Sequence, residues 1–370
     1  MTETTTDGTG AVEAPAVKAA DEEAARLETA EFETTWDGLP IAPDDPRGAT
    51  IVVRRTDGAV LLLHRAHRGP DFEGDWAWTP PAGSRQPDEP ILPAALRELA
   101  EEAGIEGVPL EPVDLSGTWA LFAASVRPDA VVTLVDPEHD RFAWVRPEEA
   151  YERVLPAVVS DGMRRALLRD LAPVSFRPLS RAEFPHLIRW QNAPHVAAYW
   201  RDRMSTVEAC EAKYGPRIDG ASATRVDVIE VAGRPVGFIQ CTPLAADSPY
   251  LDLVTSLVGR VEPVASVESA TSVASIASVA AGGEAIVIDA AIGEADLVGV
   301  GLGTRVFWAY SLMLFERFPE ASHLVAATAD GNGAAWRAAE KAGFRPLAEV
   351  VVGGERHVVA ILDRMRVFGA

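Results

Sequence analysis

Three glutamates that lie close together in the sequence are the first residues that could do chemistry. Glu98, Glu101 and Glu102 belong to the stretch LRELAEEAG, which is rich in good helix formers and ends at Gly104. On a helix, spacings of three and four residues put the three carboxylates on one face, within reach of one another. Carboxylate oxygens are the ligands that Mg²⁺ and Mn²⁺ prefer. Taken alone, however, such a cluster is more often a solvated acidic face.

The helix that would carry these glutamates can be placed from its ends. Pro93 suits a first helical turn, because its missing N–H costs nothing there. Residues 94–103 favour a helix, and Leu96, Leu99 and Ala100 can face the core. The helix would therefore hold its carboxylates beside an apolar contact surface.

A longer pattern of fixed spacing surrounds the glutamates. Its members are Gly83, Glu89, Arg97, Glu98, Glu101, Glu102, Gly104 and Ile105. This spacing matches every fixed position of the Nudix box, and the stretch resembles the Nudix hydrolase family. The segments WAWTPPAG before the box and EHDRFAWVRPEEA after it resemble the usual surroundings of that box. The resemblance extends over about residues 46–170.

The resemblance implies hydrolysis of a nucleoside diphosphate linked to another group. It implies that Glu98, Glu101 and Glu102 bind Mg²⁺ or Mn²⁺. One of them, or a carboxylate on a later loop, would orient or deprotonate the attacking water. Arg97 belongs to the same catalytic set and, with Glu89, would brace the loop and the helix. The metal would neutralise the pyrophosphate and lower the pKa of a bound water.

Glu138 and His139 form a smaller candidate pair later in the same half of the chain. They lie where many Nudix relatives carry an additional acidic group. A lone histidine beside an aspartate is more often part of a surface turn. The sequence therefore leaves both interpretations of His139 open.

A second candidate site lies in the stretch GVGLGT. Gly299, Gly301 and Gly303 would let successive backbone N–H groups converge on an anion, and a following helix N-terminus favours negative charge. A bare Gly-x-Gly is otherwise typical of a flexible turn. The spacing does not fit a dinucleotide fingerprint, because the third spaced glycine and the following acidic residue are missing.

The segments around this turn carry a second resemblance. IDAAIGEADLVGVGLGT and TADGNGAAWRAAEKAGF resemble the GNAT acetyltransferase superfamily, and the resemblance covers residues 174–365. FRPLSRAEFPHLIRWQNAPHVAAYW and GRPVGFIQC are most similar to aminoglycoside 6′-N-acetyltransferases and siderophore acyltransferases. The resemblance implies acetyl-CoA as the cofactor and N-acetylation of a small amine of the aminoglycoside kind. The positions that match the coenzyme-binding segments are Val298, Gly299, Gly301, Gly303, Thr304 and Asn332.

Asp289 matches the acidic residue that is proposed in that group as a base or as an anchor for the substrate amine. A carboxylate suits either role, because the amine must lose a proton before it attacks a thioester; an ordinary strand-end Asp is the alternative. Trp200 could line the substrate cleft, although a Trp is usually a core residue. The chain departs from the superfamily at Val298, where Gln or Arg is common. It also has Ala339 in place of the Tyr that often protonates the departing thiolate.

The remaining pattern predicts two domains, since 370 residues are more than one core usually serves. Strands and helices mix in both halves, which indicates the α+β or α/β class. We expect a Nudix α/β/α sandwich with a mixed sheet over residues 31–172. A GNAT fold, with a central, mostly antiparallel mixed sheet flanked by helices, is expected over 173–370. Residues 1–30 predict a disordered acidic tail, and 258–283 a low-complexity insertion of Ser, Ala and Val.

Individual elements follow from turns and apolar runs. Hairpins are predicted at Asp57-Gly58, at Gly233 and at Gly353-Gly354. Strands are predicted over 117–126, 130–135 and 141–145, and residues 147–171 have helical spacing.

Composition limits the partners. The net charge of −21 argues against nucleic acid, because phosphate backbones need clustered Lys and Arg. The first residues lack the basic start and apolar core of a signal peptide, and no long uncharged apolar run predicts a membrane span. Cys210 and Cys241, the two cysteines, imply no disulfide framework. We therefore expect a cytoplasmic protein whose partners are a nucleotide-type small molecule and a small amine; its oligomeric state is not indicated.

Two alternatives to a bifunctional enzyme stay open at this point. The Nudix half could bind a nucleotide metabolite and regulate the transferase, as a sensor. The GNAT half could bind coenzyme A without transferring an acetyl group.

Overall fold

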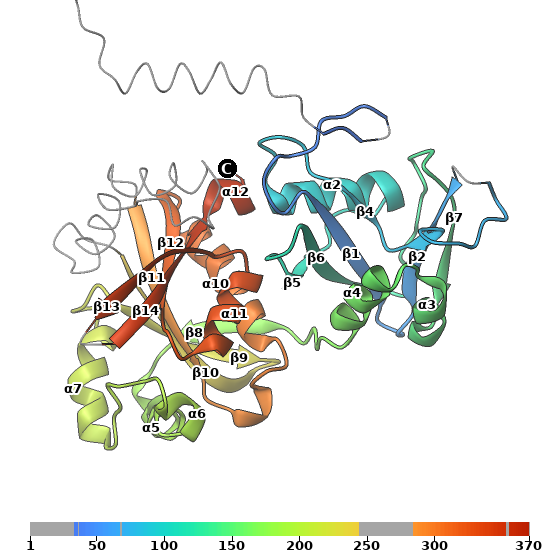
Figure 1. Ribbon diagram of the computed structural model, residues 1–370. Coiled ribbons are helices and arrows are strands. Elements are labelled where there is room, and N and C mark those ends of the chain that lie inside the picture. The colour runs from blue at the N-terminus through green and yellow to red at the C-terminus, as the bar shows by residue number, and fades with distance from the viewer. Residues whose placement is uncertain (1–32, 36, 67–68, 244–283, 353–354, 370) are drawn as a thin grey trace, which may run out of the picture.

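The computed structural model describes residues 33–35, 37–66, 69–243, 284–352 and 355–369. Two domains lie side by side, each with a mixed sheet and flanking helices, so the predicted fold class is confirmed (Figure 1). The predicted tail 1–30 and insertion 258–283 fall outside the described residues. The domain limits 31–172 and 173–370 stay predictions.

The first domain contains one mixed sheet. Its strands are β1 (Gly48–Arg55), β2 (Val60–Arg65), β3 (Trp78–Thr79), β4 (Ala82–Ser84), β5 (Glu111–Asp114), β6 (Trp119–Val126) and β7 (His139–Val145). They run in the order β3-β2-β1-β6-β5, while β4 pairs with β1 and β7 with β2. Only β1 and β6 pair in parallel.

Strand alternation places helices on both faces of this sheet. Ile51 packs toward α2 (Ile91–Ala103), whereas Val52 packs toward α4 (Ala157–Leu167). The predicted hairpin at Asp57-Gly58 forms between β1 and β2, where Gly58 adopts a φ of +95°. The helical region predicted over 147–171 is two helices, α3 (Pro147–Arg153) and α4. Pro156 separates them, because its ring would clash with the preceding helical turn and it has no N–H to donate.

The predicted strand over 130–135 does not form. The segment alternates between half-buried and exposed residues, as a strand does, but no neighbouring strand pairs with it. Its recorded backbone bond to the rest of the domain runs from the N–H of Thr133 to the carbonyl of Ala103, at the end of α2. The alternation in the sequence therefore predicted which side chains are half-buried, but it wrongly predicted that the segment pairs with another strand.

The second domain contains the larger, mostly antiparallel sheet. Its strands are β8 (Val174–Pro178), β9 (Arg225–Val231), β10 (Arg234–Pro243), β11 (Glu284–Ile292), β12 (Ala321–Ala329), β13 (Arg345–Val352) and β14 (Glu355–Asp363). They run in the order β13-β14-β12-β11-β10-β9-β8, and among the strands that the structure describes here only β11 and β12 pair in parallel. The hairpin predicted at Gly233 joins β9 and β10. Strands β13 and β14 pair antiparallel, but the turn predicted at Gly353-Gly354 falls outside the described residues.

Helices cover both faces of the second sheet. They are η2 (Arg181–Glu183), α5 (Phe184–Gln191), α6 (Pro194–Ala197), α7 (Val207–Ile218), η3 (Ala295–Leu297), α10 (Leu302–Arg317), α11 (Gly333–Lys341) and α12 (Arg364–Val367). Phe238 of β10 packs against α5 and α7, and its neighbour Ile239 packs toward α10. No helix in these described ranges has the length and apolar character needed to cross a bilayer.

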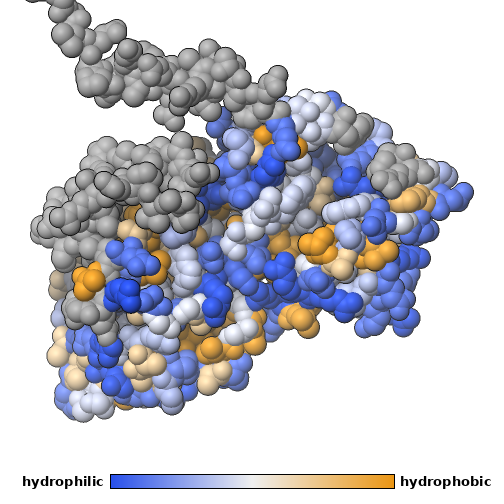
Figure 2. All heavy atoms as spheres, in the orientation of Figure 1, coloured by the Kyte–Doolittle hydropathy of each residue, from blue (hydrophilic) through white to orange (hydrophobic). Residues whose placement is uncertain are grey.

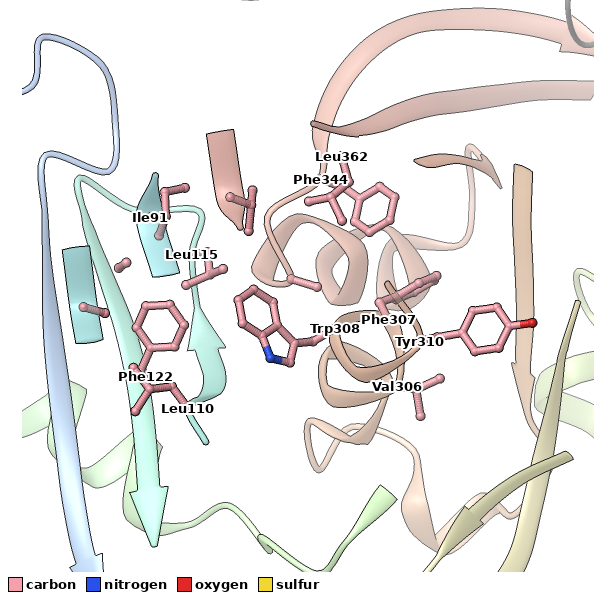
Figure 3. Close-up of a cluster of buried hydrophobic side chains, with 14 of the residues drawn as sticks. Ile91, Leu110, Leu115, Phe122, Val306, Phe307, Trp308, Tyr310, Phe344 and Leu362 are labelled. Atoms are coloured by element: carbon pink, nitrogen blue, oxygen red, sulfur yellow. The ribbon is translucent and has the colours of Figure 1, made fainter. Parts of the chain in front are cut away.

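The apolar core of α10 continues into the first domain. Trp308 projects from α10 toward Phe122 of β6 and Leu115, as Figure 3 shows, with ring centroids of Trp308 and Phe122 5.8 Å apart. Phe368, after α12, also packs against Trp308, with ring centroids 4.7 Å apart. One buried cluster thus includes residues of both domains.

A polar clamp accompanies this shared core. The side chain of Arg305 is 3% exposed and donates to both carboxylate oxygens of Glu111 in β5, at 2.8 and 3.2 Å. It also donates to the carbonyls of Asp170 and Ala172 in the segment that joins the domains, at 2.6 and 2.7 Å. Because a buried charge needs such partners, this geometry fixes α10 against the first domain.

We predict that Trp308→Ala destabilises the whole chain by about 3–5 kcal/mol, because it opens a cavity in the shared core. Leu312→Ala, on an exposed position of the same helix, should change the free energy of unfolding by less than about 0.5 kcal/mol. Urea denaturation followed by intrinsic fluorescence and circular dichroism measures both. An equal, small effect of the two substitutions would contradict a shared core.

Candidate active sites

The first site is built on helix α2, which begins at Ile91, earlier than the sequence predicted. Pro90 is its N-cap, and Gly104 ends it in the left-handed conformation with a φ of +65°. The N–H of Gly104 bonds back to Ala100, as an ended helix requires. Leu99 lies in the core, but the predicted burial of Leu96 is wrong, since that side chain is 36% exposed.

The three glutamates of α2 differ in environment. Glu98 and Glu102, four residues apart, are 8% and 3% exposed, whereas Glu101 is exposed. Oε2 of Glu102 accepts a 2.8 Å bond from the N–H of Ala82. The carboxylate of Glu98 lies so close to Gly83 that a Cβ there would come within 2.1 Å of it. Strand β4 therefore needs glycine at position 83 to admit a buried carboxylate.

Arg97 holds the loop and the helix together. Its guanidinium donates to both carboxylate oxygens of Glu89, at 2.8 and 2.9 Å, and to the carbonyl of Ser84 at 2.9 Å. Nη1 also donates to Glu98 at 2.7 Å and to Glu101 at 3.0 Å. This is the bracing that the motif implies.

Burial and charge shift the pKa values of these groups. Loss of water around Glu98 raises its pKa to about 7, although Arg97 acts in the opposite direction. Burial also raises the pKa of Glu102 well above its usual range. The bonds to Glu89 raise the pKa of Arg97. Both buried carboxylates therefore hold a proton more tightly than an exposed glutamate does.

His139 is not in a surface turn, so that interpretation is wrong. It begins β7, is 5% exposed, and places Nδ1 4.0 Å from Oε1 of Glu102. Both ring nitrogens are buried without a hydrogen-bond partner, and burial lowers the pKa of the imidazole to about 4. A neutral, unpartnered imidazole beside a buried carboxylate is a polar group available to a ligand.

The donor set suits a divalent cation. In the described part of the chain, no three His, Cys, Asp or Glu side chains are already gathered closely enough to hold an ion. Glu98 and Glu101 contact Arg97, and Glu102 contacts a backbone N–H. The candidate donors are nevertheless carboxylate oxygens on one helix face, and two of the carboxylates are buried with raised pKa values. Oxygen ligands of this kind are the ones that Mg²⁺ and Mn²⁺ bind.

The second site lies where the large sheet opens. Strands β11 and β12 pair only as far as Ile288 and Ala326, whereas β11 stays paired with β10 up to Ile292. Strand β12 likewise stays paired with β14 up to Ala329. Beyond Ile288 the facing edges of two central strands therefore no longer bond to each other, and their peptide groups are available to an extended ligand.

Asp289 is the first residue of β11 beyond this pairing. Its Oδ2 accepts a 3.4 Å bond from Gln240, which in turn accepts a 2.8 Å bond from Arg217. The side chain is exposed, yet the surrounding protein displaces enough water to raise its pKa to about 6. Asp289 is thus a carboxylate that changes charge near neutral pH at the open end of the sheet.

The glycine-rich turn forms the N-terminus of α10. Gly301 is the N-cap with a φ of +88°, and Gly299 has a φ of +81°. A Cβ at Gly303 would touch Ala338 at 3.0 Å, and one at Gly301 would lie 0.9 Å from Nη1 of Arg169. The cap supplies no side chain to the first N–H groups of α10, so this turn fits an anionic group. Val298 is 43% exposed and Thr304 is buried.

The other predicted residues of this domain occupy different places. Asn332 is the N-cap of α11 and accepts a 3.2 Å bond from the N–H of Ala335. Trp200 is half-buried and packs against Phe238, with ring centroids 4.9 Å apart; its place in the substrate cleft stays a prediction. Ala339 is fully buried.

Tyr199 is a residue that the sequence did not single out. Its exposed hydroxyl donates a 2.9 Å bond to the carbonyl of Gly331, in the loop after β12. No motif marks it, because the contact joins residues far apart in the chain. It is a hydroxyl donor close to the open end of the sheet.

Comparisons with known proteins agree with this architecture. The NUDIX domain model matches residues 44–168, and the model of the acetyltransferase (GNAT) domain matches residues 180–352. The CTP pyrophosphohydrolase of Escherichia coli (strain K12) is 37% identical over 109 residues, which cover 28% of this chain and 77% of that protein.

Solved structures resemble each half separately. Aminoglycoside acetyltransferase AAC(6')-Ib in complex with coenzyme A is 22% identical and covers 52% of this chain and 96% of that chain, with a TM-score of 0.39. A C. elegans Ap4A hydrolase is 25% identical, with coverage of 32% and 93% and a TM-score of 0.27.

The chain belongs to the Nudix hydrolase family through its first domain, and its second domain is a GNAT acetyltransferase domain. It is a two-domain enzyme that joins a Nudix pyrophosphohydrolase to a GNAT N-acetyltransferase.

Without metal, the buried charge of Glu98 should make stability depend on pH. Its folded pKa of about 7 lies above the ordinary value of 4.5, so its stabilising contribution is present below pH 4.5 and lost as the pH rises through 7. Glu98→Gln, which cannot ionise, should exceed wild type in stability at pH 8 by on the order of 1–3 kcal/mol. The difference should vanish toward pH 4.5.

Urea denaturation in the presence of a chelator, at several pH values, measures this difference. Glu101→Gln, an exposed position bonded to the same arginine, is the matched control and should differ from wild type by less than about 0.5 kcal/mol. A Glu98→Gln protein that is less stable than wild type at pH 8 would show that the charged form is favoured by folding.

Proposed function

We propose that the chain is a bifunctional enzyme. The first domain hydrolyses a nucleotide pyrophosphate with a divalent metal, and the second acetylates a small amine with acetyl-CoA. The observation that supports the hydrolase is the pair of buried carboxylates, Glu98 and Glu102, on a helix braced by Arg97. The observation that supports the transferase is the end of β11–β12 pairing beside an N-cap glycine turn.

In the hydrolase, Glu98, Glu101 and Glu102 would hold Mg²⁺ or Mn²⁺, with His139 as a neighbouring polar group. The metal, when bound, offsets the charge of the pyrophosphate and lowers the pKa of a coordinated water. A carboxylate of this set accepts the proton of the attacking water. The water oxygen bonds to phosphorus as the bridging phosphorus–oxygen bond breaks, and the leaving phosphate carries away the electron pair. Arg97 keeps the helix and the loop in register meanwhile.

The substrate of the hydrolase is proposed to be a nucleoside triphosphate or a nucleoside diphosphate linked to another group. The similar Escherichia coli protein is a CTP pyrophosphohydrolase, so CTP is the first compound to test. A screen over nucleoside triphosphates, nucleotide sugars and dinucleotides with Mg²⁺ or Mn²⁺ covers the class. No turnover of any of these compounds would refute the proposed hydrolysis.

Glu102→Gln should lower kcat for the best nucleotide substrate by on the order of 100-fold or more, because it removes a buried charged donor from the site. A chelator should abolish the same activity, and added Mg²⁺ or Mn²⁺ should restore it. Phosphate release measures both effects. Glu106→Gln, at an exposed glutamate just after α2, should leave kcat unchanged. Equal activity of the two variants would remove Glu102 from the site.

In the transferase, acetyl-CoA would extend from the turn at Gly299–Gly303 along the unpaired edges of β11 and β12. Asp289 would either accept a proton from the substrate ammonium or anchor the ammonium group until it loses its proton elsewhere. The amine nitrogen then bonds to the acetyl carbonyl carbon, the carbon–sulfur bond breaks, and the thiolate takes up a proton. Ala339 cannot supply that proton. The hydroxyl of Tyr199 or a water molecule is the donor we propose instead.

Asp289→Asn should lower acetyl transfer to the best amine by about 100- to 10,000-fold, because the proton acceptor is lost. Coenzyme A should bind to this variant as it does to wild type. In wild type, kcat/KM should rise with pH through about 6, since the carboxylate acts when it is deprotonated. Asp161→Asn, an exposed aspartate of α4, is the control. Transfer that persists in the Asp289→Asn enzyme would leave the residue as an ordinary strand-end aspartate.

The two alternatives become outcomes of these assays. If the first domain is a sensor, the wild-type chain and the Glu101→Gln variant should bind the nucleotide equally well, and neither should hydrolyse it. A coenzyme-binding half without transfer would bind coenzyme A but acetylate no member of an amine panel that includes aminoglycosides. Cys210 and Cys241 are both free and buried, which suits the reducing cytoplasm that we propose as the location.

A further inference from the structure

The segment that leaves the first domain carries an arginine onto the glycine turn of the second. Arg169 follows α4, and its guanidinium lies where a side chain on Gly301 would be: a Cβ there would meet Nη1 at 0.9 Å and Cζ at 2.1 Å. Gly301 is the N-cap of α10, so this cation lies at the start of the helix proposed to bind the coenzyme diphosphate. The contact joins the two domains.

The guanidinium of Arg169 has little else to bind. Its recorded side-chain hydrogen bond is a long one, from Nη2 to the carbonyl of Val113 at 3.5 Å. No ion pair within 4 Å joins it to any carboxylate in the residues that the structure describes; the nearby Asp114 pairs with Arg165 at 2.9 Å and with Lys341 at 3.7 Å. Most of its donors are therefore free for a ligand.

The surroundings make this corner locally positive in an acidic protein. Four cationic side chains face two carboxylates, Asp114 and Glu111; the cations are Arg165, Arg169, Arg305 and Lys341. Burial, together with the neighbouring Arg165 and Arg305, lowers the pKa of Arg169, as expected for a cation that lacks a counter-charge. Hydrophilic residues lie across the visible face where the two domains meet (Figure 2).

The glycine turn itself lacks a cation. From Val298 to Thr304 it has no basic residue, and the next residue, Arg305, is committed to Glu111 and the linker carbonyls. Val298, at the start of the turn, is apolar and exposed. A charged diphosphate at this turn would thus meet backbone N–H groups and, from outside the domain, Arg169.

We propose that Arg169 is a coenzyme-binding residue that the Nudix domain supplies to the acetyltransferase domain. Its guanidinium pairs with the diphosphate of coenzyme A at the N-terminus of α10, in the place of a basic residue of the turn. The coenzyme site is then complete only when the two domains are packed together. This inference rests on the proposed use of coenzyme A by the second domain.

Isothermal titration of the full chain with coenzyme A, without an amine acceptor, tests the proposal. Arg169→Ala should weaken coenzyme A binding by about 10- to 100-fold, the usual effect of losing a charge-assisted hydrogen bond. Pantetheine, which lacks the diphosphate, should bind wild type and variant equally. Arg169→Lys should recover part of the affinity, since it keeps the charge and loses the fork geometry. Added KCl should weaken binding more in wild type than in Arg169→Ala.

Arg146→Ala removes an equal charge from an exposed position of the same domain and is the control, with unchanged affinity expected. Thermal unfolding of each variant without ligand separates lost contacts from lost folding, and Arg169→Gln serves if the alanine variant is unstable. Unchanged coenzyme A affinity in Arg169→Ala and Arg169→Gln would overturn the proposal. Tighter binding would overturn it too, since Arg169 would then be an occupant that competes with the coenzyme. Wild type that binds pantetheine but not coenzyme A would also refute it, and wild type that binds neither would refute the proposed cofactor itself.

Discussion

The burial of helix α10 between two sheets is the constraint on which the rest of the structure depends. One side of the helix packs on the large sheet of the acetyltransferase domain, and Trp308 on the other side enters the core of the Nudix domain. Arg305 adds a buried clamp to Glu111 and to the linker. Since α10 also begins at the glycine turn, the packing that joins the domains sets the position of the proposed coenzyme site relative to the first domain.

The two proposed sites have opposite charge: one gathers carboxylates and the other gathers cationic side chains. In the Nudix domain, burial raises the pKa of Glu98 and of Glu102, and a divalent cation bound on that helix face would favour their charged forms. At the start of α10, cations outnumber carboxylates, which prepares that corner for an anion. Burial of the two carboxylates at the first site, and of Arg169 beside other arginines at the second, costs stability when no ligand is bound. Ligand binding would offset that cost in each domain.

Sequence spacing predicted what local geometry determines. The Nudix box, its helix stop at Gly104 and the hairpins at Asp57-Gly58 and Gly233 depend on neighbours within a few residues, and the structure contains them. The spacing could not show that residues 130–135 lack a pairing partner.

Contacts between distant segments were beyond the sequence for the same reason. His139, at the start of β7, meets Glu102, near the end of α2, only through the tertiary fold, and Arg169 meets Gly301 only because the two domains pack together. The buried environment of Trp308 likewise has no periodic signature, since α10 is apolar on more than one side. The contacts that the sequence did not predict are therefore those between segments brought together by tertiary packing.

Differential scanning calorimetry of the full chain tests most directly whether the domains form one unit around α10. A shared core predicts a single transition whose calorimetric and van't Hoff enthalpies agree, and which moves upward as a whole when coenzyme A is added. Two separate transitions, of which coenzyme A moves only one, would contradict a shared core and show that the domains unfold independently.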